Sequence, residues 1–148
     1  MADHVRKQLR DAVATRLTGL TTTGSRVYES RSVPVGDANL PGLLIYATQE
    51  QAADATLIED IERRIEIRVE GIAKVAANLD DTLDLIAKEV EIALSTALTI
   101  GSSTTLLVYQ GASITMRDGL DQLVGSVALA YEATVFTVAG SPDVVLGA

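Results

Sequence analysis

The sequence of 148 residues contains no cysteine, no tryptophan and a single histidine. Without cysteine the chain can form neither a disulfide framework nor a thiolate metal site, and nothing argues against a reducing cytoplasm. The histidine, His4, lies close to the N-terminus, so a Ser-His-Asp triad is not expected. We therefore predict no catalytic residues, no metal and no cofactor, and we interpret the chain as a protein that is not an enzyme.

Aromatic residues and long apolar runs are also scarce. Aromatic side chains make up only 3% of the sequence, which disfavours surfaces on which nucleic-acid bases or sugars stack. No apolar run is long enough to cross a membrane. The basic residues near the N-terminus are not followed by an apolar segment, so we expect no secretory signal and no membrane partner.

Positive charge is in short supply as well. The chain has 12 basic and 20 acidic residues and a formal net charge of −8, so it lacks the electrostatic footprint of a protein that binds phosphate groups. Arg6, Lys7 and Arg10 could form a basic face on the first helix, but Asp3 and Asp11 offset them. The charge balance indicates a solvated acidic surface.

The clearest pattern is an alternating stretch that runs directly into an amphipathic helix. Between residues 63 and 75 apolar and charged side chains alternate, which is typical of a half-buried strand. Asn78 follows at the position of an N-cap, and Asp80 and Asp81 place negative charge on the first turn, where the helix dipole favours it. The next apolar residues recur at helical spacing and predict a helix that packs on a sheet: Leu79, Leu83, Ile86, Val90, Ala93, Leu94 and Ala97.

The other segments complete a single domain spanning residues 1–148. Asp3 is expected to cap a first helix that ends near Gly19. Further strands are expected at residues 26–35, 42–48, 105–116 and 123–136, and an apolar tail at residues 138–148. The order α-β-β-β-α-β-β predicts the α+β class, with two helices packed on one face of a mixed, mainly antiparallel sheet.

Two details of these segments carry expectations of their own. In the strand at residues 105–116 we expect Leu106, Val108, Ala112 and Ile114 to lie on one side, with Gly111 as a bulge. Residues 49–58 are polar and rich in alanine without a strong period, and we interpret them as a mobile loop.

The clusters of charged residues favour structural roles over a metal site or a catalytic site. Asp80, Asp81 and Asp84 point in different directions on a helix, which favours a dipole complement over a metal site. The acidic residues between positions 59 and 70 mostly alternate with Arg63, Arg64 and Arg68, as cross-strand salt links do.

Leu85 and Ile92 do not fit the predicted core. They lie seven residues apart on a flank of the second helix, off its apolar stripe. Two stacked apolar residues next to an acidic surface indicate a binding partner, unless the sheet curls to cover that flank. The residues alone do not decide between these alternatives.

Several segments together resemble the tail terminators of long-tailed bacteriophages. They are the run Leu40-Pro41-Gly42-Leu43-Leu44-Ile45-Tyr46, a polar Gln/Glu/Ala segment, the alternating strand that ends in Val69-Glu70-Gly71, the run from Asn78 to Asp84, and the run from Glu89 to Leu94. The resemblance depends on order and spacing, not on a catalytic motif, and it extends from the first helix to the last strand.

The resemblance implies a virion protein at the head-proximal end of the tail, assembled in the host cytoplasm. Tail terminators form a hexameric ring on the tail tube protein, stop its polymerisation and provide the surface for the head-completion or neck protein. DNA passes through the ring without specific binding. On this interpretation Leu85, Ile92, Arg64 and Arg68 are candidates for the subunit interface. The segment expected to contact the tail tube contains Gln49, Glu50, Gln51 and Asp54.

Other functions stay open at this point. A related phage neck or tail-completion protein could share the same order of elements. A small-ligand-binding α+β module is a further alternative, which convergent polar groups in a pocket would support. A hydrolase or transferase is a more distant one, because neither an acid–base pair nor a nucleophile can be placed.

Overall fold

Two helices and eight strands follow one another in the computed structural model, which describes residues 2–29, 40–54, 60–75, 77–101, 103–118 and 123–146. The elements are α1 (Val5–Leu17), β1 (Val27–Tyr28), β2 (Gly42–Asp54), β3 (Asp60–Val75), α2 (Leu79–Ala93), β4 (Leu98–Ile100), β5 (Ser103–Thr105), β6 (Val108–Asp118), β7 (Leu123–Val138) and β8 (Ser141–Val145). The α+β class and the order of the long elements are as predicted. The short strands β4, β5 and β8 were not predicted.

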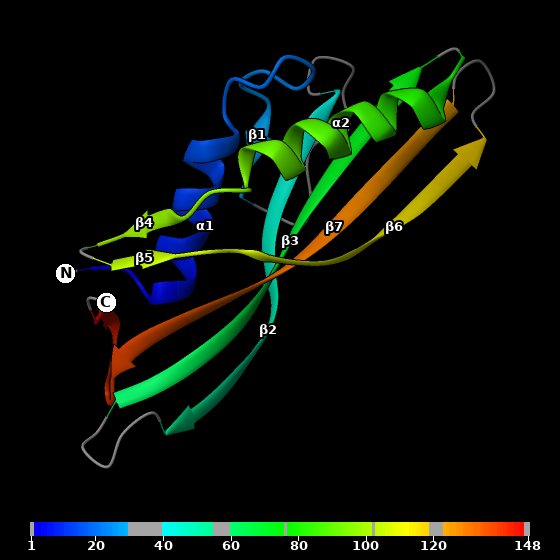
Figure 1. Cartoon of the computed structure of the whole chain (residues 1–148). Coiled ribbons are helices and arrows are strands. Elements are labelled where there is room, and N and C mark those ends of the chain that lie inside the picture. The colour runs from blue at the N-terminus through cyan, green and yellow to red at the C-terminus, as the bar shows by residue number, and fades with distance from the viewer. Residues whose placement is uncertain are drawn as a thin grey trace.

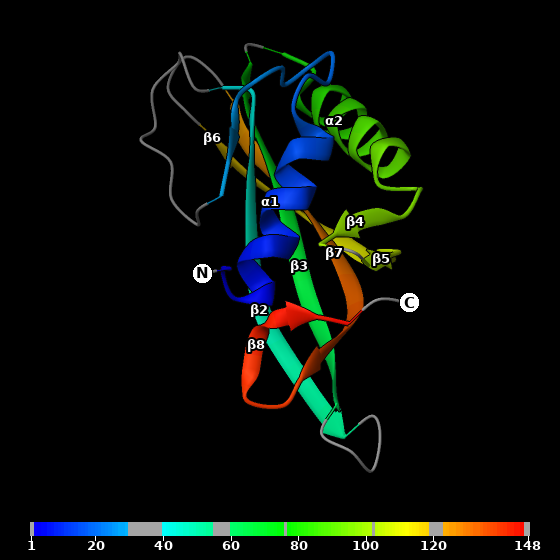
Figure 2. The ribbon, with the colours of Figure 1, turned by 90° about the vertical axis from the view of Figure 1, so that its left-hand side faces the viewer.

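The main sheet has the order β1-β2-β3-β7-β6, and β8 pairs with β7. Only β1 runs parallel to its neighbour, so the sheet is mixed and mainly antiparallel, as expected. Both helices lie on the same face of this sheet, and the β4–β5 hairpin lies beside α1 (Figures 1 and 2).

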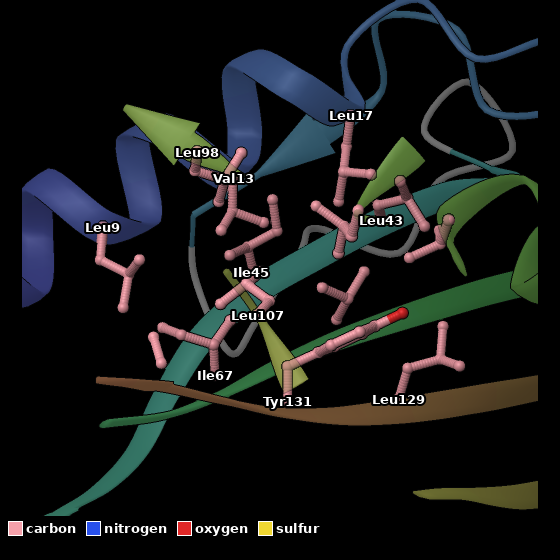
Figure 3. Packing of buried hydrophobic residues seen from close by; sticks show 14 of the residues in the cluster. Leu9, Val13, Leu17, Leu43, Ile45, Ile67, Leu98, Leu107, Leu129 and Tyr131 are labelled. Carbon is pink, nitrogen blue, oxygen red and sulfur yellow. The ribbon is translucent and has the colours of Figure 1, made fainter. Parts of the chain in front are cut away.

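The core forms between the helices and the two central strands, which pair along their whole length from Asp60–Val138 to Val75–Leu123. Alternate residues of β3 and β7 are buried on the helix side, which confirms the predicted alternation. Leu9, Val13 and Leu17 of α1 pack on Leu43 and Ile45 of β2 in this core (Figure 3).

Two glycines bring α2 close to the sheet. A Cβ atom on Gly71 would lie 2.6 Å from Cγ2 of Ile86, and one on Gly125 would lie 2.8 Å from Cδ2 of Leu79. Of the predicted stripe of α2, Ala93 is half-buried, Ala97 is exposed beyond the end of the helix, and the other residues are buried: Leu79, Leu83, Ile86, Val90 and Leu94. Asn78 precedes the helix, as predicted. It stands at the N-cap with φ 60° and makes no side-chain capping hydrogen bond, because its left-handed backbone does not have the extended conformation of an ordinary N-cap.

Interactions at the helix ends tie α1 to its surroundings. His4, not Asp3 as predicted, caps α1, and its Nδ1 accepts a hydrogen bond from the Arg6 backbone N–H at 3.1 Å. The last turn of α2 contains no basic residue. Arg16 of α1 instead donates to the carbonyl oxygens of Ala93 and Ala97 at 3.0 Å, so its charge complements the C-terminal end of the α2 dipole.

Two predicted segments need correction, and a third is described only in part. Residues 49–54 form the second half of β2, not a mobile loop, because they pair with residues 61–66 of β3 beyond a bulge at Ala47/Gln49; residues 55–59 lie outside the described residues. The described part of the first strand is limited to Val27–Tyr28, and residues 30–39 lie outside the described part. Leu106, Val108, Ala112 and Ile114 are exposed. They do not share one side: Val108 pairs with Glu132, whereas Ala112 and Ile114 pair with Leu129 and Val127, which are buried on the helix side. The expected bulge at Gly111 is confirmed by a register shift between Tyr109 and Gly111.

Candidate assembly surfaces

The outer flank of α2 presents Leu85 and Ile92 to solvent. Their exposed fractions are 47% and 63%, so the sheet does not curl to cover them. Lys88, also exposed, lies three residues after Leu85 and four before Ile92, which places all three on one flank of the helix. We call these three residues the α2 flank patch.

The neighbouring side of α2 carries the carboxylates of Asp84 and Glu91. Burial, followed by the negative charge of Glu91, raises the pKa of Tyr109 on β6. Asp84 and Ala87 precede Glu91 by seven and four residues and share its flank. Lys88 lies four residues after Asp84 and three before Glu91, so it stands between these carboxylates and the two apolar side chains.

Arg64 and Arg68 lie on the other side of the sheet from the helices. They alternate along β3 with the buried residues Ile65, Ile67 and Val69, and adjacent residues of a strand point to opposite faces. The structure thus does not bring the two arginines together with Leu85 and Ile92. The four predicted interface residues belong to two separate surfaces.

Both arginines have carboxylate partners within their own strand. Arg64 Nε donates to Glu62 and Arg68 Nε donates to Glu66, each at 3.0 Å. These pairs run along β3 and not across strands, which corrects the predicted cross-strand arrangement for these two residues. The neighbouring Thr48 hydroxyl, followed by the hydrogen bonds from Arg68 and Gln49, holds the pKa of Glu66 below its usual value.

The end of β2 and the start of β3 form an arm that extends beyond the helices (Figure 2). Gln49, Gln51 and Asp54 are exposed on this arm. The Gln49 side-chain amide donates to Glu66 at 3.1 Å. Three of the four residues predicted to contact a tail tube are therefore accessible on a paired strand.

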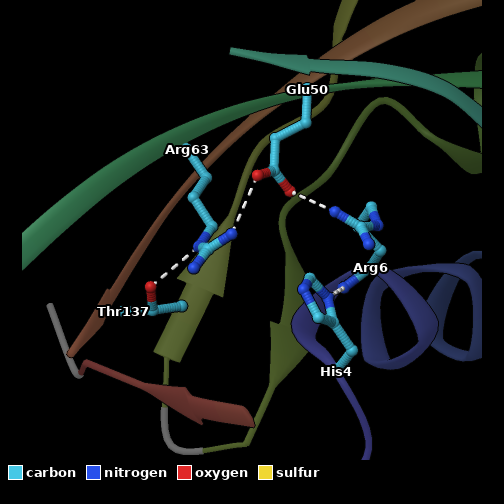
Figure 4. Close-up of polar contacts among 5 residues, drawn as sticks. All are labelled: His4, Arg6, Glu50, Arg63 and Thr137. Atoms are coloured by element: carbon cyan, nitrogen blue, oxygen red, sulfur yellow. Dashed lines mark hydrogen bonds and ion pairs between the residues drawn. The ribbon is translucent and has the colours of Figure 1, made fainter. Parts of the chain in front are cut away.

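Glu50, the fourth, is bound inside the domain at the base of the arm. Its carboxylate accepts hydrogen bonds from Arg63 at 2.8 Å and from Arg6 of α1 at 3.0 Å (Figure 4). Arg63 also donates through Nε to the buried hydroxyl of Thr137 at 2.8 Å. The Glu50 and Arg63 side chains are only 16% and 11% exposed. This network fixes the arm to α1 and to β7.

The sequence predictions missed an exposed apolar row on β6. Tyr109, Ile114 and Met116 are 45%, 52% and 47% exposed. They pair with Tyr131, Val127 and Gly125 of β7, so they stand on the helix side of the sheet, next to α2. We call these three residues the β6 row. The signal that could have revealed it is the number of helices: two helices cannot cover every strand of the sheet.

The described residues offer no evident catalytic or metal-binding arrangement. They contain no group of three or more His, Asp or Glu side chains placed to hold a metal ion. A hollow on the arm holds about 200 Å³, below the roughly 300 Å³ at which small-molecule sites begin. It is lined by Gln51, Ala52, Ala53, Glu62 and Arg64. No helix in the described part of the chain is long and apolar enough to span a membrane.

Comparison with known proteins finds similarity among solved structures. No protein-family model and no curated protein matches the chain. A chain of the virion of a native gene transfer agent particle is 21% identical and superposes with a TM-score of 0.49, over 88% of this chain and 92% of that chain. A solved structure that carries no functional name is 13% identical, with a TM-score of 0.51 over 86% of this chain and 94% of that chain. The similarity to this second structure shows that the two proteins share a fold. Because a fold does not determine a function, the function is argued from the surfaces of this chain.

Proposed function

We propose that this chain is a structural virion protein of a phage-like particle and acts as a tail terminator. Copies of it form a ring, most simply a hexamer, on the finished tail tube. The ring stops polymerisation of the tube and presents the surface to which a head-completion or neck protein binds. The order and spacing of residues 40–46, 63–71, 78–84 and 89–94, which resemble tail terminators, carry the proposal.

The surfaces of the chain are compatible with such a role. Exposed apolar side chains occur on α2 and on β6, and a ring built from one kind of subunit needs two different surfaces that meet head to tail. We assign Leu85 and Ile92 to one subunit contact and Arg64 and Arg68 to a second contact on the other face of the sheet.

The arm formed by β2 and β3 is our candidate for the contact with the tail tube. It extends beyond the helices, and its exposed residues Gln49, Gln51 and Asp54 supply polar groups for that contact. Glu50 contributes by holding the base of the arm, and does not touch the tube.

The charge of the chain suits a ring through which DNA passes. A formal net charge of −8 repels phosphate groups. A ring with such walls would let DNA through without binding it. We place assembly in the host cytoplasm and the finished ring at the head-proximal end of the tail.

The test is removal of this chain from the particle that encodes it. We expect tubes that run beyond their normal length and filled heads that remain unattached, as seen by electron microscopy. Adding the purified wild-type chain to such an extract should restore joined particles. Tails of normal length, joined to heads in its absence, would show that the chain has another function.

A further inference from the structure

The base of the arm is held by a cluster of polar side chains from four elements. The Glu50 carboxylate of β2 accepts hydrogen bonds from Arg63 of β3 and from Arg6 of α1 (Figure 4). Gln8 of α1 adds a hydrogen bond at 2.9 Å from its side-chain amide to the backbone carbonyl of Asp143 on β8. The first turn of α1 is therefore tied to both β2 and β8.

His4 lies beside Arg6 in this cluster and caps α1 (Figure 4). Its Nδ1 accepts a hydrogen bond from the Arg6 backbone N–H at 3.1 Å. An imidazole nitrogen accepts a hydrogen bond only while it carries no proton, so the neutral ring has its proton on Nε2. Protonation of Nδ1 turns this acceptor into a donor and sets two N–H groups against each other. The cap consequently exists only while His4 is neutral.

The charged groups that act on His4 belong to four elements. They are Arg6 of α1, Arg63 of β3, Glu50 of β2 and Asp143 of β8. Burial, followed by the two arginines, lowers the pKa of His4 from 6.5, and the two carboxylates act in the opposite direction. The ring is therefore neutral near neutral pH. Once protonated in acid, it is repelled by Arg6 and attracted by Glu50, so it opposes the contact between these two residues.

Arg6 connects the cap to the arm. Its backbone N–H is the group that His4 caps, and its guanidinium is the group that binds Glu50 at 3.0 Å. The Arg6 side chain is 45% exposed, so the pair with Glu50 is weak by itself and depends on the position of the first turn of α1. In β2 the bulge at Ala47/Gln49 directly precedes Glu50, and a bulge bends the strand that contains it. The contact with Arg6 thus holds β2 to α1 just beyond this bend.

We propose that His4 is a pH-sensitive latch at the base of the arm. The neutral imidazole caps α1 and keeps Arg6 on Glu50, whereas the protonated imidazole releases both contacts and gives the arm freedom of movement relative to the helices. The Glu50–Arg63 pair and the ladder between β2 and β3 do not involve His4, so the arm moves as a paired unit. The latch goes beyond the proposed ring function and does not depend on it.

The test takes advantage of a sequence without cysteine, in which two introduced cysteines accept spin labels at chosen positions. Ala53→Cys places one label on the arm and Asp81→Cys places the other on α2, both at exposed positions. Double electron–electron resonance measures the distribution of distances between the labels, and dilution with unlabelled full chain suppresses distances between copies. We expect a narrow distribution at about pH 7.5 and a wider one at about pH 5.

Hydrogen exchange of the Arg6 amide reports on the cap itself. After correction for the intrinsic effect of pH, its protection should fall about fivefold between the same two pH values, as expected for the loss of one N-cap. His4→Asn is the matched control, because asparagine caps a helix without titrating. In that variant neither the distance distribution nor the protection of Arg6 should change with pH.

Arg6→Ala separates the contact with the arm from the titration of His4. Without the guanidinium the distribution should be wide at both pH values. Circular dichroism at both pH values checks that the variants are folded. A wild-type distribution that stays narrow at about pH 5, or one that widens equally in His4→Asn, would overturn the latch. A narrow distribution in Arg6→Ala would also overturn it, because the arm would then be held by other contacts. None of these results depends on native mass, so the ring function stands or falls separately.

Discussion

Glu50 is the residue at which three elements of the domain meet. It lies on β2 and accepts hydrogen bonds from Arg63 of β3 and Arg6 of α1. With side chains that are only 16% and 11% exposed, the Glu50–Arg63 pair is shielded from water to a degree that surface pairs are not. Removing one partner of a shielded pair leaves the other charge without compensation.

We predict that Glu50→Gln lowers the free energy of unfolding by about 2–4 kcal/mol. The matched control is Glu62→Gln, which breaks the pair with Arg64, a side chain that is 57% exposed. That change should cost about 0.5 kcal/mol or less, because solvent screens exposed pairs. Chemical denaturation of the two variants measures both values. Equal effects of the two substitutions would mean that the network at the base of the arm is not shielded.

His4 gives the N-terminal end of α1 a dependence on pH. Burial, followed by the charges of Arg6 and Arg63, lowers its pKa from the ordinary value of 6.5, while Glu50 and Asp143 act in the opposite direction. The unfolded chain therefore takes up the proton more readily than the folded chain. The stability that His4 contributes is present above about pH 6.5 and is lost as the pH falls below that value.

The single histidine makes this prediction direct to measure by NMR titration. We expect one imidazole titration with a midpoint below 6.5. His4→Asn keeps a side-chain acceptor at the N-cap without a titrating group, so it should lose less stability than the wild type between about pH 7 and about pH 5.5. A midpoint above 6.5 would contradict the arrangement around His4.

At the scale of elements, α2 lies close to the sheet at two glycines, which have no side chain to keep the helix away. Gly71 and Gly125 leave room for Ile86 and Leu79, and a methyl group added at either glycine would lie too near these side chains for ordinary contact. The close approach buries the apolar stripe of α2 on β3 and β7. It also fixes which flank of α2 faces β6.

We predict that Gly71→Ala destabilises the domain by about 1–3 kcal/mol, because the new methyl group would overlap the stiff, branched side chain of Ile86. Ile86→Leu removes the Cγ2 branch, so the double variant should regain part of the loss. A double-mutant cycle by thermal or chemical unfolding measures this coupling. If Gly71→Ala stabilised the chain through its higher strand propensity, the close packing of α2 on β3 would be wrong.

The elements that could be predicted from the sequence are those with one buried face. The alternation of β3 and the apolar stripe of α2 each follow from burial on one side. The alternation is confirmed, and the stripe is confirmed from Leu79 to Leu94 but not at Ala97, which is exposed beyond the helix. The prediction for residues 49–54 was wrong because an arm that projects from the core needs no apolar alternation; pairing with β3 holds it in place. The prediction that the apolar positions of β6 share one side was wrong because the bulge before Gly111 shifts the register, so that Val108 and Ile114 face opposite sides of the sheet.

The candidate surfaces could also be predicted from the sequence only in part. Helical spacing alone placed Leu85 and Ile92 outside the core, and both are exposed. The β6 row required the sheet order, which places β6 at an edge. The separation of Arg64 and Arg68 from the α2 flank patch required knowing which face of β3 the helices cover. Sheet order and helix placement arise from contacts between distant residues, which no local pattern records.

At the scale of the whole molecule, the excess of acidic residues sets the response to DNA. A net charge of −8 opposes association with phosphates, and Arg6 and Lys7 already pair with Glu50, Asp3 and Asp11. We predict no measurable binding of duplex DNA at physiological salt, in a fluorescence-anisotropy titration with the purified chain. Tight binding that weakens steeply with added salt would instead identify a basic surface that the net charge conceals.

The central claim is that copies of this chain close into a ring, and the native mass of the purified protein tests it most directly. Light scattering across a concentration series should show a discrete assembly in equilibrium with the 15.6 kDa subunit. A hexamer would have six times that mass, about 94 kDa. The population of this species should rise with concentration and then stop growing in size, because a closed ring leaves neither surface free. A chain that remains a 15.6 kDa monomer at the highest attainable concentration, or one that grows into open filaments, would contradict the claim.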